Sequence, residues 1–241
     1  MERHNVRELF EANGILIDNS RASRLEAYAR MVYEENTRFN LTGKKSFTEV
    51  VEHLVVQSIT PILGLKVPRR TLFADIGTGA GIPGVPIGIL YDDMNGVLIE
   101  SNLKKVNFIK SVIKELGIRN LTVLNERIEE IGRNSEYREK FNIVFSRALG
   151  SLYMVLELSA PLLANSGISY VYSNEDIENI DTNVVSHAVN LGMEPFRDEK
   201  SSVYNIGSYG LIFRKVKATD SRYPRRFAVI KRESQKFNRI V

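Results

Sequence analysis

Four residues at alternate positions form the stretch of this sequence best suited to hold a ligand. Asp75, Gly77, Gly79 and Gly81 follow one short apolar run and precede another. Glycine tolerates the left-handed backbone of tight turns and lets the chain pass close to a bound molecule. A helix that begins after such a turn also offers its unpaired N–H groups to the ligand. The pattern therefore predicts a ligand-binding loop, although the glycines could also serve only to shape a turn.

Two cofactor classes are compatible with this loop. The segment from Gly79 to Gly84 matches the dinucleotide fingerprint G-x-G-x-x-G, and Glu100 at the end of the next apolar run could bind the ribose of either cofactor. The spacing from Asp75 to Gly81 resembles instead the acid-x-G-x-G-x-G loop of Rossmann-like methyltransferases, which bind S-adenosylmethionine. That resemblance implies that Asp75 helps to hold the methionine end of the cofactor, that Gly77 and Gly79 pass beneath it and that Glu100 contacts the ribose. We therefore favour S-adenosylmethionine over a nicotinamide cofactor.

The elements around the loop predict an α/β fold. From Thr71 onward, the short apolar runs TLFADI, VLIE, LTVL, FNIVFS and ISYVY alternate with helix-period stretches at Val85 to Tyr91, Leu103 to Leu116 and Ser151 to Leu163. Strands that alternate with helices form right-handed βαβ units, so the sheet should be parallel and covered by helices on both faces. A late run, Leu211 to Val216, reads as an antiparallel strand at or near the sheet edge.

The first 65 residues read differently, as helices without strands. Apolar residues recur at the helical period after Leu25, with Ser20 as the expected N-cap, and Ser46 and Glu49 have the spacing of a capping box. Proline and clustered charge in Lys66 to Arg70 then interrupt the periodicity. We expect a helical extension over residues 1–65, a Rossmann-like domain over 66–216 and a basic tail over 217–241.

Composition narrows the chemistry further. Hydrophobic residues at 43% and charged residues at 26% are ordinary for a globular protein. The absence of cysteine excludes disulfides and thiolate catalysis, and the wide spacing of His4, His53 and His187 argues against a metal site. No apolar run reaches the roughly 18 residues of a membrane span, and the charged start does not resemble a signal peptide. We expect a cytoplasmic protein, a monomer, without a metal or a membrane partner.

Charge is distributed unevenly along the chain. From Arg214 to Val241 there are ten Lys and Arg residues against Asp220 and Glu233, a net charge of +8, so the remaining 23 basic and 27 acidic residues give −4. A basic tail on an acidic body suggests a polyanionic partner such as nucleic acid, whereas the alternative is a tail that only improves solubility. Arg222, Arg225 and Arg226 are our candidate RNA contacts.

Several separated blocks of the chain together resemble one family, the bacterial 16S ribosomal RNA guanine-N7 methyltransferases (the RsmG or GidB family). The blocks run in the family's order from about Asn40 to Leu163. They are Asn40-Leu41-Thr42, the proline-containing loop Gly77 to Gly84, Glu100 to Lys105, Arg127-Ile128-Glu129-Glu130 and Ser146-Arg147-Ala148. Tyr223 to Arg226 is similar to the Y-P-R-[KR] tail of some members.

The resemblance implies a class I methyltransferase that uses S-adenosylmethionine to methylate guanine N7 in 16S RNA or the small ribosomal subunit. It implies cofactor contacts at Gly77 and Ile82, at Ile128 and Glu129 beside the adenine, and at Arg147 over the reacting face. Ile82 could instead be simple packing, and Glu129 a solvated helix charge. Arg147 also closes an apolar strand, which places it at the ligand-binding edge of a parallel sheet.

Two departures from the family leave other functions open. The family commonly has Asp-Ser with a nearby histidine in the helix before the sheet, where this chain has Gln57-Ser58 with His53 out of register, and it commonly has Lys-Gly where this chain has Ser173-Asn174. One alternative is therefore a non-catalytic RNA-binding or ribosome-assembly factor on the same fold. Another is a small-molecule methyltransferase, which the basic tail disfavours. Methylation of guanine N7 itself would need no general base, because that nitrogen carries a lone pair and no proton.

Overall fold

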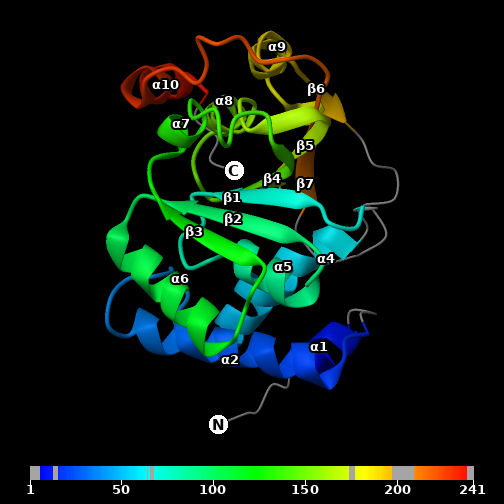
Figure 1. Cartoon of the computed structure of the whole chain (residues 1–241), viewed down its shortest axis with the longest axis vertical. Helices are drawn as coiled ribbons and strands as arrows, with labels where there is room; N and C mark the ends of the chain where they lie inside the picture. The colour runs from blue at the N-terminus through cyan, green and yellow to red at the C-terminus, as the bar shows by residue number, and fades with distance from the viewer. Residues whose placement is uncertain are drawn as a thin grey trace.

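A seven-stranded sheet forms the centre of the molecule (Figure 1). The computed structural model describes residues 6–12, 16–63, 65, 68–173, 177–196 and 209–237. The sheet order is β3-β2-β1-β4-β5-β7-β6, with β1 to β5 parallel and β7 antiparallel to both of its neighbours. The strands are β1 (Leu72–Ile76), β2 (Asn95–Glu100), β3 (Leu121–Asn125), β4 (Phe141–Arg147), β5 (Leu163–Ser173), β6 (Met193–Phe196) and β7 (Tyr209–Lys215).

Helices cover both faces of the sheet (Figure 1). On one face lie α1 (Val6–Ala12), α2 (Asn19–Asn36), α3 (Phe47–Glu49), the π-helix η1 (Val50–Val56), α4 (Gln57–Leu63), α5 (Gly84–Leu90) and α6 (Leu103–Glu115). On the other face lie α7 (Ile128–Ile131), α8 (Leu152–Ser159), α9 (Thr182–Asn190) and α10 (Phe227–Ser234), with a short 3-10 turn η2 (Ile177–Asn179) before α9. The class I methyltransferase architecture expected from the sequence is confirmed.

The alternation of side chains along the strands explains this division into two layers. On β4, Phe145 packs with the helices of the first face, whereas Val144 packs with those of the second. Successive residues of a strand point to opposite faces, so a strand that is apolar at every position needs helices on both sides. The short apolar runs of the sequence are strands of this kind.

The N-terminal helices pack directly on the first face. Leu25 and Tyr28 of α2 are fully buried in the same core as Phe73 of β1. Helix α2 begins two residues earlier than its sequence suggests: the N-cap is Asp18, which accepts the backbone N–H of Arg21 at 2.8 Å, so the expectation of a Ser20 cap is wrong. The capping box of Ser46 and Glu49 is confirmed.

Most of the expected elements are present. The five strands and three helices that alternate after Thr71 are confirmed, and the late strand at Leu211 to Val216 is β7, one position in from the edge. The edge itself is β6, four residues long, which was not predicted. Its sequence, Met-Glu-Pro-Phe, contains a proline, which is tolerated on an edge strand and hides the strand pattern.

The basic tail folds back onto the second face. Tyr223 and Ile230 are buried in the core formed by α8 and α9. The guanidinium of Arg138 donates to the backbone carbonyls of Tyr223 and Thr219, both at 2.8 Å. The described part of the tail is therefore tied to the domain by apolar burial and by hydrogen bonds to its backbone.

A buried ion pair fixes the tail against α8. The carboxylate of Glu157 is fully buried, and Arg225 donates to it through its backbone N–H at 2.9 Å and its guanidinium at 2.6 Å. Burial alone would raise the pKa of Glu157, but the hydrogen bonds from Arg225 lower it to about 2. A carboxylate with a depressed pKa stabilises the fold above its unfolded pKa near 4.5, and that stabilisation disappears as the pH falls toward 2.

We expect Glu157→Gln to lower the free energy of unfolding by roughly 3 kcal/mol at neutral pH, because removing one partner leaves the other charge unpaired. For a chain of this size the melting temperature should fall by about 6 to 12 °C. Glu233→Gln is the matched control, since Glu233 pairs with Lys236 on the surface at 3.1 Å. Calorimetric melting of both variants checks this, and equal melting temperatures would show that the pair does not anchor the tail.

Candidate active site

The glycine loop lies between β1 and α5 and has the backbone that its sequence requires. Gly77, Gly79 and Gly81 all have positive φ, at 67°, 60° and 95°. The N–H groups of Gly77 and Thr78 donate to the carbonyl of Ile99 at 2.9 and 3.2 Å, so the loop crosses the carboxyl end of β2. A Cβ on Gly77 would collide with the side chain of Leu149, whereas one on Gly79 would have no atom nearer than 3.9 Å. The backbone of Gly79 therefore borders open space.

Asp75 is fully buried and holds the loop from below. Its Oδ2 accepts the hydroxyl of Thr78 and the backbone N–H of Gly84, the latter at 2.8 Å. Its Oδ1 is buried and has no hydrogen-bond partner among the described residues. Burial raises the pKa of Asp75 to about 7, with the hydrogen bonds opposing it. A buried acceptor of this kind is suited to a ligand that supplies a donor or a positive charge.

Glu100 reaches the same loop from the end of β2. Its two carboxylate oxygens accept the N–H of Gly79 at 3.0 Å and the N–H of Asn102 at 2.8 Å. The acid thus fixes the middle of the loop and the start of α6. A carboxylate offers about four acceptor positions, so Glu100 keeps capacity for ribose hydroxyls.

The third acidic position, Glu129, lies in the short helix α7 that follows β3. Glu129 is buried in α7, with Arg127 at 3.6 Å from its carboxylate, whereas Glu126 and Glu130 are exposed. Ile128 is half-buried, and Ile82 is buried in the core with the N-terminal helices. The fold therefore brings Glu100, Glu129 and the glycine loop to one edge of the sheet, and no described contact joins Ile128 or Glu129 to the loop.

Arg147 ends β4 at this same edge and is held by the helical extension. Its guanidinium donates to the hydroxyl of Ser58 at 2.6 Å and to the carbonyl of His53 at 2.5 Å. It also lies 5.5 Å from the ring centre of Tyr172, whose hydroxyl donates to the carbonyl of Ser58. Burial lowers the pKa of Arg147. These contacts fix the arginine, and its charge is close enough to Asp75 to oppose the rise in that carboxyl's pKa.

A wide helical turn lies where the helical extension contacts Arg147 through His53 and Ser58. Residues Val50–Val56 form the π-helix η1, and the N–H of Gln57 donates to the carbonyl of Glu52, five residues earlier. Turns of this type commonly occur at functional sites. Sequence reasoning treated Gln57-Ser58 as a departure from the family and did not assign a role to Ser58. The serine that the family also has at this place was the available signal, but only the fold shows that it meets Arg147.

A second point of contact joins the extension to the glycine loop. The hydroxyl of Tyr28, a fully buried residue of α2, donates to the carbonyl of Ala80 at 3.0 Å. Tyr28 was predicted only as an apolar position of a helix. Its hydroxyl supplies a hydrogen bond to a loop carbonyl, that of Ala80, which would otherwise be unpaired.

The three candidate RNA contacts in the tail have different surroundings. Arg225 is paired with the buried Glu157. Arg222 is exposed, lies 3.9 Å from Asp220 and covers the ring of Tyr223 at 5.0 Å. Arg226 is exposed at the start of α10. Arg222 and Arg226 are therefore accessible to a partner, whereas the charge of Arg225 is already engaged within the fold.

In the parts of the chain that the structure describes, no group of three or more His, Asp and Glu side chains is placed to hold a metal ion. Likewise, no helix in the described ranges is long and apolar enough to cross a membrane.

Comparison with known proteins identifies the family. The family model for rRNA small subunit methyltransferase G (GidB) matches residues 21–201. Proteins named ribosomal RNA small subunit methyltransferase G include one from Carboxydothermus hydrogenoformans, 32% identical over 92% of this chain and 94% of its own length. Another, from Desulforamulus reducens, is 34% identical over 85% of this chain and 86% of its own length.

Solved structures agree on the fold. A protein from Galdieria sulphuraria, provisionally assigned as a sarcosine dimethylglycine methyltransferase, has a TM-score of 0.52 at 12% identity, covering 79% of this chain and 98% of that chain. At so low an identity the likeness concerns the fold alone.

The raised pKa of Asp75 predicts a pH dependence of stability. A carboxyl whose pKa is about 7 in the folded protein and 3.8 in the unfolded chain stabilises the fold fully below pH 4, and this contribution is lost as the pH rises to 7. Asp75→Asn keeps an oxygen for Thr78 and Gly84 but does not ionise. Denaturant unfolding of both proteins at several pH values should show wild type losing as much as about 4 kcal/mol relative to the variant. Parallel curves would contradict a raised pKa.

Proposed function

The chain belongs to the rRNA small subunit methyltransferase G family, and from that membership we propose that it transfers a methyl group from S-adenosylmethionine to N7 of a guanine in 16S ribosomal RNA. The observation that carries the proposal within this molecule is the glycine loop, with the unpartnered oxygen of Asp75 beneath it and Arg147 fixed beside it. These features lie at the carboxyl edge of a parallel sheet, where ligands of this fold class bind.

The residues at this edge fit the cofactor. S-adenosylmethionine supplies a methyl group on a positively charged sulfur, next to an ammonium and a carboxylate. The unpartnered Oδ1 of Asp75 suits the cationic end, and the open space over Gly79 lets the backbone approach it closely. We assign the ribose to Glu100, the adenine to Ile128 and Glu129, and a further cofactor contact within the loop to Ile82. Gly77 and Gly81 provide the turns that keep side chains out of this space.

Catalysis would rest on alignment. Guanine N7 has a lone pair and no proton, so the chain has to place this atom in line with the methyl group, and it does not have to remove a proton. Arg147 has five N–H donors, and two of its nitrogens are used by Ser58 and His53. We assign the remaining donors to O6 of the guanine, which lies next to N7 on the same edge of the base.

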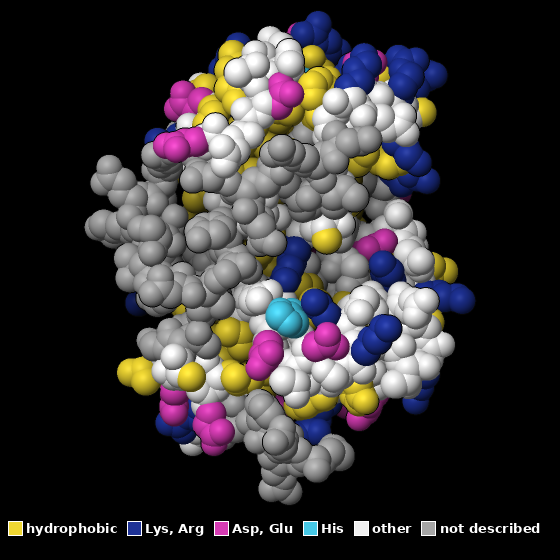
Figure 2. All heavy atoms as spheres, turned by 180° about the vertical axis from the view of Figure 1, so that it is seen from behind, with side chains coloured by type: hydrophobic (Ala, Val, Ile, Leu, Met, Phe, Trp, Pro, Cys, Tyr) yellow, Lys and Arg dark blue, Asp and Glu magenta, His cyan; other side chains and the backbone are white. Residues whose placement is uncertain are grey.

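The basic tail supports an RNA partner. Exposed cations lie along the tail and α10 at Arg222, Arg226, Lys231, Arg232 and Lys236. Lys and Arg side chains gather over this part of the surface, at the upper right of Figure 2. We propose that these groups contact phosphates and that Arg225 positions the segment through Glu157.

We infer a division of labour between the three segments of the chain. Residues 1–65 would support Arg147 and the glycine loop, residues 66–216 would bind the cofactor, and residues 217–241 would contact RNA. We further propose that the protein works as a monomer in the cytoplasm, where small ribosomal subunits are found.

The purified protein should transfer labelled methyl from S-adenosylmethionine to small subunits, or to their RNA, from cells that lack this enzyme. RNA from wild-type cells should not accept the label, because its N7 is already methylated. Mass mapping of the product identifies the base and atom. Label at another atom, or equal label on both substrates, would contradict the N7 assignment. Cofactor binding without transfer would instead support a non-catalytic assembly factor, and transfer only to a metabolite would support a small-molecule enzyme.

Arg147→Ala should lower kcat by about a hundredfold, the effect of a misplaced reactant. Ser58→Ala should lower it by about tenfold, because it removes one hydrogen bond to a charged group. Ser159→Ala, which alters a buried serine on the other face of the sheet, is the matched control and should keep wild-type turnover. Steady-state methyl transfer, with thermal melting to confirm folding, makes the comparison. Full turnover in Arg147→Ala would show that this arginine is only structural.

A further inference from the structure

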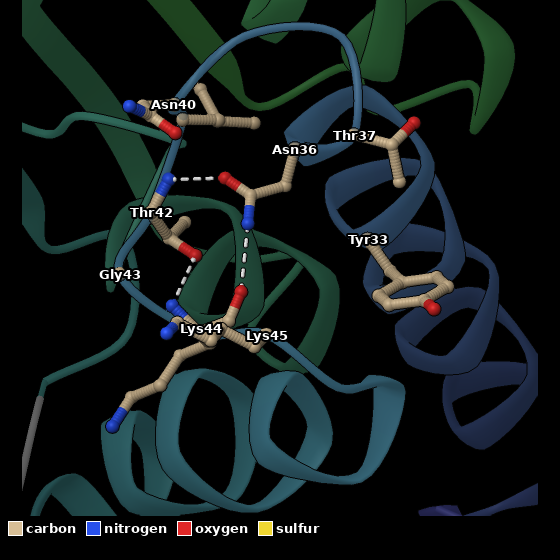
Figure 3. A pocket seen from close by; sticks show the side chains of 9 residues that line it. Tyr33, Asn36, Thr37, Asn40, Thr42, Gly43, Lys44 and Lys45 are labelled. Carbon is tan, nitrogen blue, oxygen red and sulfur yellow. Dashed lines mark hydrogen bonds between the residues drawn. The ribbon is translucent and has the colours of Figure 1, made fainter.

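A pocket that contains none of the residues we assign to the cofactor lies beside α2 (Figure 3). Its volume is about 640 Å³, and it is bounded by the last turns of α2 and by the loop that follows, residues 37–45. The block Asn40-Leu41-Thr42, which the sequence analysis singled out and which the cofactor site does not use, forms part of its wall.

The wall of the pocket is preformed. The side-chain amide of Asn36 accepts the N–H of Thr42 and donates to the carbonyl of Lys44, both at 2.7 Å, as Figure 3 shows. The N–H of Lys44 donates to the hydroxyl of Thr42 at 3.1 Å, and Leu41 is buried in the core. The loop is therefore braced from both sides, so a ligand would not have to order it.

The pocket lies on the same edge of the sheet as the glycine loop. Helix α2 runs from the amino edge, where Arg24 donates to the carbonyl of Leu116 just before β3, to the carboxyl edge, where Tyr28 meets Ala80. Asn36 lies two turns beyond Tyr28, about 12 Å further along the helix axis. In Figure 1 the loop after α2 is accordingly on the side where β2 and β3 end.

The lining combines positive charge with an aromatic surface. Lys44 is half-buried and Lys45 is exposed. Within the described residues neither ammonium takes part in an ion pair, whereas the nearby Arg38 is paired with Glu35. Glu49 accepts the backbone N–H groups of Lys45 and Ser46. The ring of Tyr33 is 36% exposed and packs edge-on against Phe47.

We propose that this pocket binds a nucleotide of a single-stranded RNA segment near the target guanine, with its phosphate at Lys44 and Lys45 and its base on Tyr33. Cationic groups beside an aromatic ring are the usual means of holding unpaired RNA. The polar and charged lining favours RNA over an apolar protein segment. The inference rests on the proposed function, because it assumes that the substrate is RNA.

The test compares two double variants of the full chain. Lys44→Ala with Lys45→Ala removes the charges of the pocket, and Lys110→Ala with Lys114→Ala removes the same charge from the exposed side of α6. Filter binding of purified small-subunit RNA is measured between about 50 and 200 mM salt. The slope of log affinity against log salt should flatten by about one to two in the first variant, as expected for lost phosphate contacts, and stay unchanged in the second.

Tyr33 provides a second and independent measurement. Tyr33→Ala should weaken RNA binding about fivefold or more without changing the salt slope, since it removes a stacking surface and no charge. Tyr33→Phe should restore the affinity. Cofactor affinity, measured by calorimetry, should be the same in all of these variants.

Several outcomes separate this inference from the proposed function. If wild type methylates small subunits but the Lys44 and Lys45 variant keeps the wild-type salt slope, the pocket does not bind RNA and the proposed function stands. If binding weakens only with assembled subunits and not with free RNA, the pocket contacts a ribosomal protein and the inference is wrong. If the slope flattens as expected but wild type transfers no methyl, the inference holds and the proposed function fails.

Discussion

The buried carboxylate of Asp75 determines the shape of the loop on which the site depends. A carboxylate removed from water needs hydrogen-bond donors, and the Thr78 hydroxyl and the Gly84 N–H supply them. The chain between these donors must therefore curl over the end of β1, and the glycines with positive φ allow it to do so. Because the loop uses one oxygen, the other is left for a ligand, in a place where burial makes its charge costly. A cationic ligand would relieve that cost, so the group that shapes the loop also favours what we propose the loop binds.

The helical extension and the sheet form one site, although they differ in sequence character. Tyr28 of α2 satisfies a carbonyl of the glycine loop, and Ser58 holds the guanidinium of Arg147. The π-helix η1 ends two residues before Ser58 and includes His53, whose carbonyl accepts a hydrogen bond from another nitrogen of that guanidinium. An arginine at a strand end could otherwise adopt many rotamers, and these contacts select one of them. The extension therefore helps to fix Arg147 and the glycine loop, and it also contributes to the core.

Structural features that a few neighbouring residues determine could be predicted from the sequence, whereas contacts between residues far apart in the chain could not. The glycine loop, the alternating strands and the Ser46 capping box were predicted correctly because a few neighbouring residues determine each of them. The start of α2 was misplaced because Asp18 and Ser20 are both good capping residues and only the fold selects between them. The roles of Ser58 and Tyr28 could not be read from the sequence, because their partners lie 89 and 52 residues away. Strand β6 was missed because a short edge strand with a proline lacks the expected pattern.

The charge of the tail shows why composition alone does not define a binding surface. Ten cations against two acids predicted a polyanionic partner, but a charge can contribute to counterion release only if it is free to meet a phosphate. Arg225 is neutralised by the buried carboxylate of Glu157, so its contribution is to hold the tail in place. Arg226, the next residue, projects into solvent at the start of α10. Adjacent arginines thus differ in role: Arg225 fixes the tail within the fold, whereas the charge of Arg226 stays available for the RNA contact that we propose.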